Sequence, residues 1–261
     1  MKLLKKIFVA IVTGSMLFGC STSNKVPTDE DFIVNVGKGL EKRWDDVIDD
    51  VSDLGTSEIQ SNYKTAVQDE LSAIGNIDDY EFENEDLKEL GKKYIAALNL
   101  QMDGIQYVGT DDYEKYEETW YRGYCYRALY LKQFVDDYGL TVKPEKQTDL
   151  DNILAEYSVA KESIDNYEFA TYLEDNLVYS KEESRSNEWT SYYTAIVENT
   201  TDHEIANISI SANFIDASGV TVYNSYSYIN NIKSGAKAES ELYYDVEKGD
   251  FDHIELTVEI Y

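Results

Sequence analysis

Apolar residues between about residue 30 and residue 162 recur every three or four positions, which is the period of an amphipathic helix. The sequence predicts four long helices in this region and a shorter fifth helix beyond Pro144. The first carries Phe32, Val36, Leu40, Trp44 and Val47, the second opens after Ser57 and stops at Gly75, the third follows Asn84, and the fourth begins at Thr110 and ends at Gly139. Residues 31–175 are therefore expected to form an all-α helical bundle.

The period changes from 3.6 to 2 near residue 175. Ile208, Ile210, Ala212 and Phe214 alternate with polar residues, and so do Ile254, Leu256, Val258 and Ile260. Such alternation is typical of strands with one buried face. Several short runs of this kind, separated by turn residues, predict an antiparallel β-sandwich of the Ig-like kind over 176–261. The expected fold class is α + β in two domains, in which the sheets bury their apolar faces against each other without help from the helices.

The N-terminus has the order of charged and apolar residues found in secretory signals. Three lysines precede an apolar run over 7–18, which is too short to span a bilayer. The run closes on Leu17-Phe18-Gly19-Cys20, which resembles the lipobox of bacterial lipoproteins. The resemblance implies cleavage of residues 1–19, lipidation of Cys20 by fatty acids such as palmitate, and retention on the outer face of the cell membrane. An ordinary cleaved signal and an uncleaved anchor are the alternatives. Residues 20–30 are small and polar, which predicts a flexible tether.

Charge narrows the range of partners. The chain has 51 acidic residues against 23 Lys and Arg, a formal net charge of −28, and cleavage of the signal would remove three of the lysines. This charge repels nucleic acid and a bare anionic membrane, so no nucleic acid is expected as a partner and the membrane would be reached only through the Cys20 lipid. A cationic protein, a cationic peptide or a divalent ion is favoured. The alternative is that the acids only solvate the surface.

Cysteine use excludes a disulfide framework. If Cys20 carries lipid, Cys125 is the only cysteine left, and no intrachain disulfide can form. The fold must then be held by its core, which 43% hydrophobic residues with 23 tyrosines can supply. Cys125 lies between Tyr124 and Tyr126 in the predicted fourth helix, so we expect a buried, unreactive thiol and not a nucleophile.

The C-terminal region has a recurrent layout of strands and turns. It contains Asn213-Phe214-Ile215-Asp216-Ala217-Ser218-Gly219, preceded by Glu198-Asn199-Thr200 and followed by Lys233-Ser234-Gly235. In this layout the region resembles the FxLYD family, small β-sandwich modules of bacterial surface lipoproteins. Of the family signature, Ala212-Asn213-Phe214-Ile215-Asp216 keeps only the aspartate and the apolar character. The resemblance implies a binding or spacer module and no enzymatic activity.

Motifs that carry enzyme chemistry are sparse. His203 and His253 lack the spacing of a zinc protease, and the sequence has no GxSxG, P-loop or GxGxxG motif. No catalytic residue and no cofactor is therefore predicted. Asp45, Asp49 and Asp53 lie one turn apart on the first helix and could share a divalent cation or act as an acid–base pair, with a solvated helix face as the alternative.

The predicted fourth helix holds the remaining candidates. Trp120 and Tyr124 belong to an aromatic stripe that could contact a sugar or peptide, although core packing explains it more simply. Arg127 falls on the apolar stripe and would need a carboxylate partner if buried, so it marks a structural ion pair or a ligand contact. The helix opens with acids that complement its positive end and are expected to form a solvated face. They are Asp111, Asp112, Glu114, Glu117 and Glu118.

Two functional hypotheses follow from these patterns. The first is a non-enzymatic, membrane-anchored lipoprotein that binds or scaffolds a protein, a peptide or a cell-wall component. The second is a cell-envelope enzyme that uses carboxylates of the helical domain. A deep pocket with paired carboxylates beside Arg127 would favour the enzyme.

Overall fold

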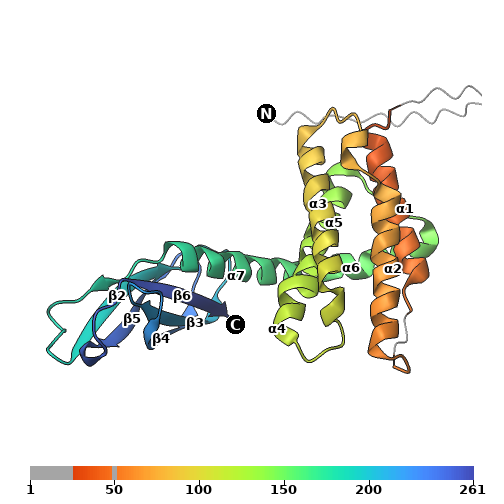
Figure 1. The fold of residues 1–261 in the computed structure, drawn as a ribbon. Coiled ribbons are helices and arrows are strands. Elements are labelled where there is room, and N and C mark those ends of the chain that lie inside the picture. The colour runs from red at the N-terminus through yellow and green to blue at the C-terminus, as the bar shows by residue number, and fades with distance from the viewer. Residues whose placement is uncertain (1–25, 49–51) are drawn as a thin grey trace, which may run out of the picture.

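The computed structural model describes residues 26–48 and 52–261. Helices make up the N-terminal half, and two small antiparallel sheets follow at the other end of an elongated molecule (Figure 1). The α + β class predicted from the sequence is confirmed at this level. The predicted signal peptide over 1–19, the predicted lipidation site Cys20 and the candidate ligand Asp49 lie outside the described residues.

The helical half follows the 3.6-residue period closely. Its helices are α1 (Asp29–Asp46), α2 (Thr56–Ile74), α3 (Glu85–Gly104), α4 (Tyr113–Tyr116), α5 (Arg122–Tyr138), α6 (Gln147–Ala155) and α7 (Tyr157–Asn176). Some details differ from the prediction. Helix α2 begins at Thr56, so Ser57 is inside it, and α4 begins at Tyr113 and not at Thr110. A π-helical turn, η3 (Glu117–Tyr121), interrupts the expected fourth helix, and the expected fifth helix is two helices, α6 and α7, that meet at Glu156.

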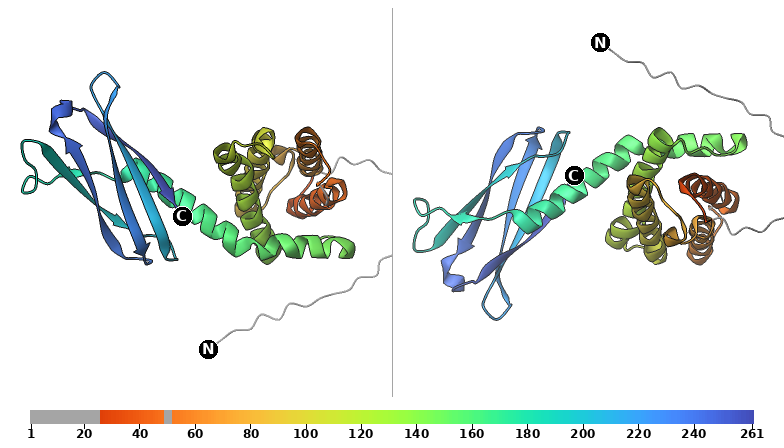
Figure 2. Two further views of the ribbon diagram at one scale, coloured as in Figure 1. Left: turned by 90° about the horizontal axis from the view of Figure 1, so that it is seen from below. Right: turned by 90° about the horizontal axis from the view of Figure 1, so that it is seen from above.

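The core of the bundle lies between α1, α2, α3 and α5, which stand side by side in two views (Figures 1 and 2). Phe32 and Leu40 of α1, Tyr94 of α3 and Phe134 of α5 are fully buried there. A β-carbon on Gly123 would lie 2.8 Å from the carbonyl oxygen of Ala97, so glycine is what lets α5 approach α3 this closely.

The strands form two separate sheets. The strands are β1 (Ser180–Lys181), β2 (Thr190–Glu198), β3 (Ile205–Ile215), β4 (Thr221–Ile232), β5 (Lys237–Asp245) and β6 (His253–Ile260). One sheet has the order β1-β2-β5 and the other β4-β3-β6, and every pairing is antiparallel. The period-2 alternation predicted the buried face of β3 correctly, because Ile208, Ile210, Ala212 and Phe214 all point inward.

The two sheets meet through side chains. Phe214 of β3 packs on Tyr244 of β5, with ring centroids 4.8 Å apart. The hydroxyl oxygens of Ser225 and Ser227 on β4 accept hydrogen bonds from the backbone N–H groups of Tyr243 and Glu241 on β5. These bonds satisfy donors that the edge strand β5 would otherwise leave free.

Helix α7 belongs to both halves of the molecule and runs from the bundle to the sheets (Figure 1). Its first turns pack Ala160 and Ile164 against Cys125 of α5, and its last turns place Phe169 and Leu173 in the apolar cluster of the strands. Contrary to the expectation, the strand cluster does include apolar surface from a helix, and whether the sheets need that surface to fold stays a prediction. The physical reason is that the strand cluster is open on the side of β6, where α7 covers it and Glu174 accepts the N–H of Val258 at 2.7 Å.

Candidate functional site

Arg127 is enclosed in the bundle, and its carboxylate partner is Glu70 of α2. The guanidinium Nε lies 3.2 Å from Glu70 Oε1, and Arg43 of α1 approaches the other carboxylate oxygen at 2.9 Å. The Tyr94 hydroxyl also donates to Glu70, and Arg43 donates to Gln101 Oε1 at 3.1 Å. The exposed fraction of every member is below 8%, so this buried cluster offers no surface to a ligand.

Electrostatics keep Glu70 ionised inside the core. Burial by itself would raise the pKa of Glu70, but Arg127 and Arg43 hold it below its ordinary value. The cluster thus combines two guanidinium groups with one carboxylate and carries a net positive charge. Arg127 Nη2 and Gln101 Nε2 have no hydrogen-bond partner in the described part of the chain.

The other two candidates on the predicted fourth helix are core or half-buried residues. Trp120 is 8% exposed and stacks on Tyr63 at a centroid distance of 5.1 Å. Tyr124 is half-buried and packs beside Tyr121. Neither side chain lies with Arg127 in a common ligand site.

The aspartates of the first helix are not gathered around one point. Asp45 pairs with Lys146 at 2.8 Å, and Asp53 is exposed beyond the end of α1. Asp49 lies outside the described residues. A hydrogen bond to Asp69 raises the pKa of Asp46, so the exposed Asp46 and the half-buried Asp69 do form a pair.

A groove of about 730 Å³ lies where the helical half meets α7 and β6. One wall is α4 with η3. Asp112 caps α4 by accepting the N–H of Lys115, and the π-helical turn that follows carries Glu117 and Glu118 into the lining beside Tyr113. The acids that the sequence assigned to a solvated helix end are exposed, as predicted, and three of them, Glu114, Glu117 and Glu118, lie along this hollow.

The opposite wall comes from α7 and β6. Helix α7 contributes Glu162 and Tyr167, and β6 with the residue after it contributes Glu259 and Tyr261. Arg122, at the start of α5, places its guanidinium carbon 3.3 Å from the centroid of the Tyr167 ring, which joins α5 to α7 within the lining.

The groove is acidic and rich in tyrosine. Its lining holds five glutamates and four tyrosines against a single cationic side chain. Two of the tyrosine hydroxyls are bound to these acids: a hydrogen bond to Glu117 raises the pKa of Tyr113, and a hydrogen bond to Glu259 raises the pKa of Tyr261. Both phenols stay neutral, while the carboxylates present oxygen acceptors next to flat aromatic faces. A ligand with positive charge and apolar stems fits this chemistry.

Cys125 lies behind this groove and not in it. Its side chain is buried, as predicted, and burial raises the pKa of the thiol. A protonated thiol is a weak nucleophile. Its lack of reactivity stays a prediction.

The sequence alone could not predict that most residues of the groove lie together. The acids of the fourth helix were visible as a cluster, but Glu162 and Glu259 are far from them in sequence and reach them only through the fold. Glu70, by contrast, had a signal: it is three residues after Val67 and four before Ile74, on the apolar stripe of α2.

A comparison with family models, with curated proteins and with solved structures finds no match for this chain. Within residues 26–48 and 52–261, no helix has both the length and the apolar character that a membrane span requires. The functional argument therefore rests on the groove itself.

Proposed function

We propose that this chain is a non-enzymatic lipoprotein of the cell envelope whose groove between α4, α7 and β6 binds a cationic segment of a peptide or protein. The observation that carries the proposal is the lining of the groove, with five glutamates, four tyrosines and one arginine that is already stacked on Tyr167. Lysine and arginine side chains suit such a lining, because their charged heads pair with carboxylates and their stems pack on aromatic rings.

The address in this proposal comes from the N-terminal sequence. Cleavage after residue 19 and lipidation of Cys20 would hold the protein on the outer face of the membrane, and residues 20–30 would let the groove stand away from the lipid surface. The partner would then be another protein of the envelope or a peptide that reaches it. Its positive charge distinguishes it from the lipid headgroups and nucleic acids that the chain repels.

The C-terminal half in this proposal is an Ig-like sandwich of the FxLYD kind that serves as a binding wall or spacer. Several turns support it. Asp216 Oδ1 accepts the N–H groups of Ser218 and Val220, and Gly219 completes this turn with a φ of +82°. The buried Asn199 donates to the carbonyl oxygens of His203 and Ile232, so it ties the turn after β2 to the end of β4.

Peptide binding to the purified full chain tests the groove. The probe is a fluorescent peptide of alternating lysine and alanine, and a glutamate–alanine peptide of equal length should not bind. The triple variant Glu117→Gln, Glu118→Gln and Glu259→Gln should weaken binding of the lysine peptide about tenfold at physiological salt, because each exposed ion pair contributes modestly.

The matched control removes the same charge elsewhere. Glu188→Gln, Glu204→Gln and Glu247→Gln change three exposed carboxylates away from the groove. This control should change the affinity by less than about twofold, since charges beyond a Debye length are screened. Equal losses in both triple variants would show that net charge, and not the groove, attracts the peptide, and the proposal would be wrong.

For the enzyme alternative, one pair of carboxyl groups in the helical half is the candidate acid–base pair. Glu70 is closed off by two arginines, whereas Asp46 and Asp69 share a hydrogen bond that raises the pKa of Asp46. A carboxyl group with a raised pKa beside a second carboxyl group is a candidate acid–base pair. An activity of the purified protein that disappears in Asp46→Asn and persists in Asp45→Asn would favour this alternative.

A further inference from the structure

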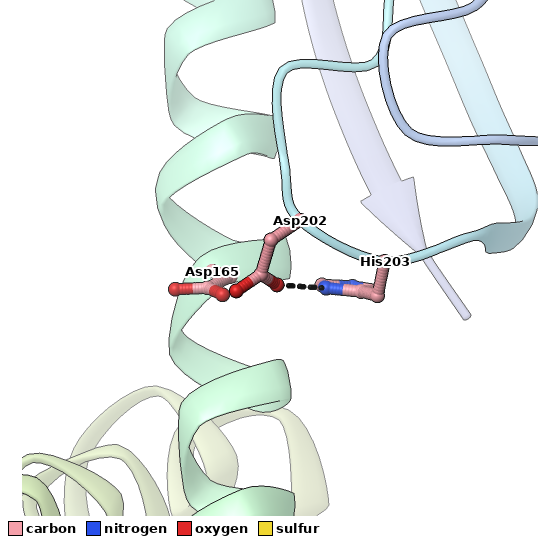
Figure 3. A group of neighbouring side chains, drawn as sticks. All are labelled: Asp165, Asp202 and His203. Atoms are coloured by element: carbon pink, nitrogen blue, oxygen red, sulfur yellow. Dashed lines mark hydrogen bonds and ion pairs between the residues drawn. The ribbon is translucent and has the colours of Figure 1, made fainter.

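Three potential metal ligands come together where α7 meets the turn between β2 and β3. Asp165 belongs to α7, and Asp202 and His203 belong to the turn (Figure 3). One ligand atom from each residue can be chosen so that all lie within 4.8 Å of one another. Ligand atoms around a tetrahedral ion with bonds of about 2.1 Å lie about 3.4 Å apart. Side-chain shifts of roughly 1 Å within the set, which includes the exposed Asp202, would bring the three atoms to that spacing.

The histidine is held in the orientation that metal binding needs. His203 Nε2 lies 2.8 Å from Asn166 Oδ1 and donates to it, which leaves the lone pair of a neutral ring on Nδ1. Nδ1 faces Asp202 Oδ1 at 3.3 Å, so two electron-rich atoms approach each other. This contact is stable only with a proton or a cation between them.

Lys161 already places a positive charge beside the two aspartates. Its Nζ lies 2.5 Å from Asp165 Oδ2 and 2.9 Å from Asp202 Oδ2. The Lys161 side chain is 37% exposed, and its flexible stem can leave the carboxylates without disturbing the helix. The site thus attracts cations and holds an internal competitor for them.

The surroundings leave room for further ligands. A hollow of about 400 Å³ adjoins the site, and its lining includes Glu168 and Thr201 as well as the two aspartates and Lys161. Water or a side chain from this hollow can complete the coordination. One imidazole nitrogen with two carboxylate oxygens suits Zn²⁺, whereas Ca²⁺ takes six to eight oxygen ligands.

We propose that Asp165, Asp202 and His203 Nδ1 bind a zinc-class divalent ion that displaces Lys161. The ion would join the β2–β3 turn to α7, next to Asn166, which also lines the peptide groove. This site is independent of the groove, because it requires neither the glutamates of the groove nor a peptide.

Zinc titration of the full chain tests the proposal. The protein is purified in detergent with a tag that lacks histidine, stripped with a chelator, and titrated with Zn²⁺ against a chromophoric chelator. One equivalent should bind with a micromolar or lower Kd, and thermal unfolding should shift upward with added Zn²⁺ because the ion binds only the folded chain. His203→Gln should weaken binding at least tenfold.

The Lys161→Met variant gives the sharpest outcome. Removing the competing ammonium should tighten Zn²⁺ binding about tenfold. If the cluster were only a structural set of ion pairs, the same variant would lower the stability of the protein and would not increase its affinity for Zn²⁺. His253→Gln is the matched control, because His253 also has two acidic neighbours but its two ring nitrogens face different ones, Asp252 and Glu255. It should leave the affinity unchanged.

NMR of the histidine ring nitrogens tests the proposal on the wild-type chain, so it does not depend on the stability of any variant. In the wild-type chain, Zn²⁺ should shift the Nδ1 resonance of His203 while Nε2 keeps its proton. No binding at millimolar Zn²⁺, equal affinity in His203→Gln, or a charged ring with both nitrogens protonated at neutral pH and excess Zn²⁺ would each overturn the proposal.

Discussion

Single side chains decide what the helical half can and cannot do. The sequence places Arg127, a cation, on an apolar helix stripe. In the fold Arg127 pairs with Glu70 of another helix, and Arg43 of a third helix pairs with the same carboxylate. Each buried charge costs free energy unless it is paired and hydrogen-bonded. The cluster therefore fixes how α1, α2 and α5 meet, and it is a structural device more than a place for substrate.

The Glu70→Gln variant should be strongly destabilised. It leaves two guanidinium groups in the core without a counter-charge, and removal of one partner of a buried ion pair costs about 3–5 kcal/mol. Chemical denaturation of the full chain measures the free energy of unfolding. Glu89→Gln is the control, since Glu89 pairs with Lys92 on the exposed face of α3 and its loss should change stability very little.

The pH dependence of the same variant checks the cause. Because the pKa of folded Glu70 lies below its ordinary value of 4.5, the stability it contributes is present above pH 4.5 and is lost as the pH falls through the lower, folded value. Glu70→Gln should lack this part of the acid destabilisation. A variant as stable as wild type at pH 7 would show that the arginines need no carboxylate.

At the scale of elements, α7 determines the architecture. It begins in the bundle, ends at Asn176 beside the strands, and supplies Phe169 and Leu173 to the strand cluster. The predicted domain boundary at 175 and 176 coincides with the end of this helix, and whether the two parts fold separately stays a prediction. What the contacts indicate is that α7 accompanies the strands.

Fragments of the chain test this role of α7. We expect 157–261 to unfold cooperatively and 177–261 to be largely unfolded, because loss of a buried Phe and a buried Leu costs about 5 kcal/mol or more, close to the whole stability of a small domain. Circular dichroism during denaturation makes the measurement. Within 157–261, Leu173→Ala should destabilise clearly and the exposed Tyr172→Ala should not. A cooperative transition in 177–261 equal to that of 157–261 would refute the role given to α7.

The difference between elements that could and could not be predicted has a physical cause. The long helices and the buried face of β3 follow from local periodicity, which a single sequence displays. The break between α6 and α7 at Glu156 has no glycine or proline to mark it, so a single sequence does not display it. The groove depends on the placement of Glu162 and Glu259 opposite Glu117, and no local pattern encodes that placement.

At the scale of the whole molecule, charge and shape act together. The body is elongated (Figure 2). Its acidic surface repels anionic lipid, and the groove lies where α4 and η3 face α7 and β6. A protein of this charge has little electrostatic affinity for an anionic membrane, so the proposed retention there would depend on a covalent lipid. In the proposed function, Cys20 carries that lipid, and residues 20–30 form the tether that lets the groove stand away from the lipid surface.

The Cys20→Ala variant tests this dependence in bacteria grown with a labelled fatty acid. Label should enter the wild-type protein and should be absent from the variant, because the Cys20 sulfur is the only position that the lipobox offers for the diacylglyceryl group. High salt should not release the labelled wild-type protein from membranes, since acyl chains hold it at about 0.8 kcal/mol per buried CH₂ and not by charge. Cys125→Ala is the matched control, because it removes the other cysteine, which is buried in the bundle, and it should keep full labelling. Label in the Cys20→Ala protein would contradict the lipobox assignment, and an unlabelled wild-type protein found in the medium would identify an ordinary cleaved signal instead.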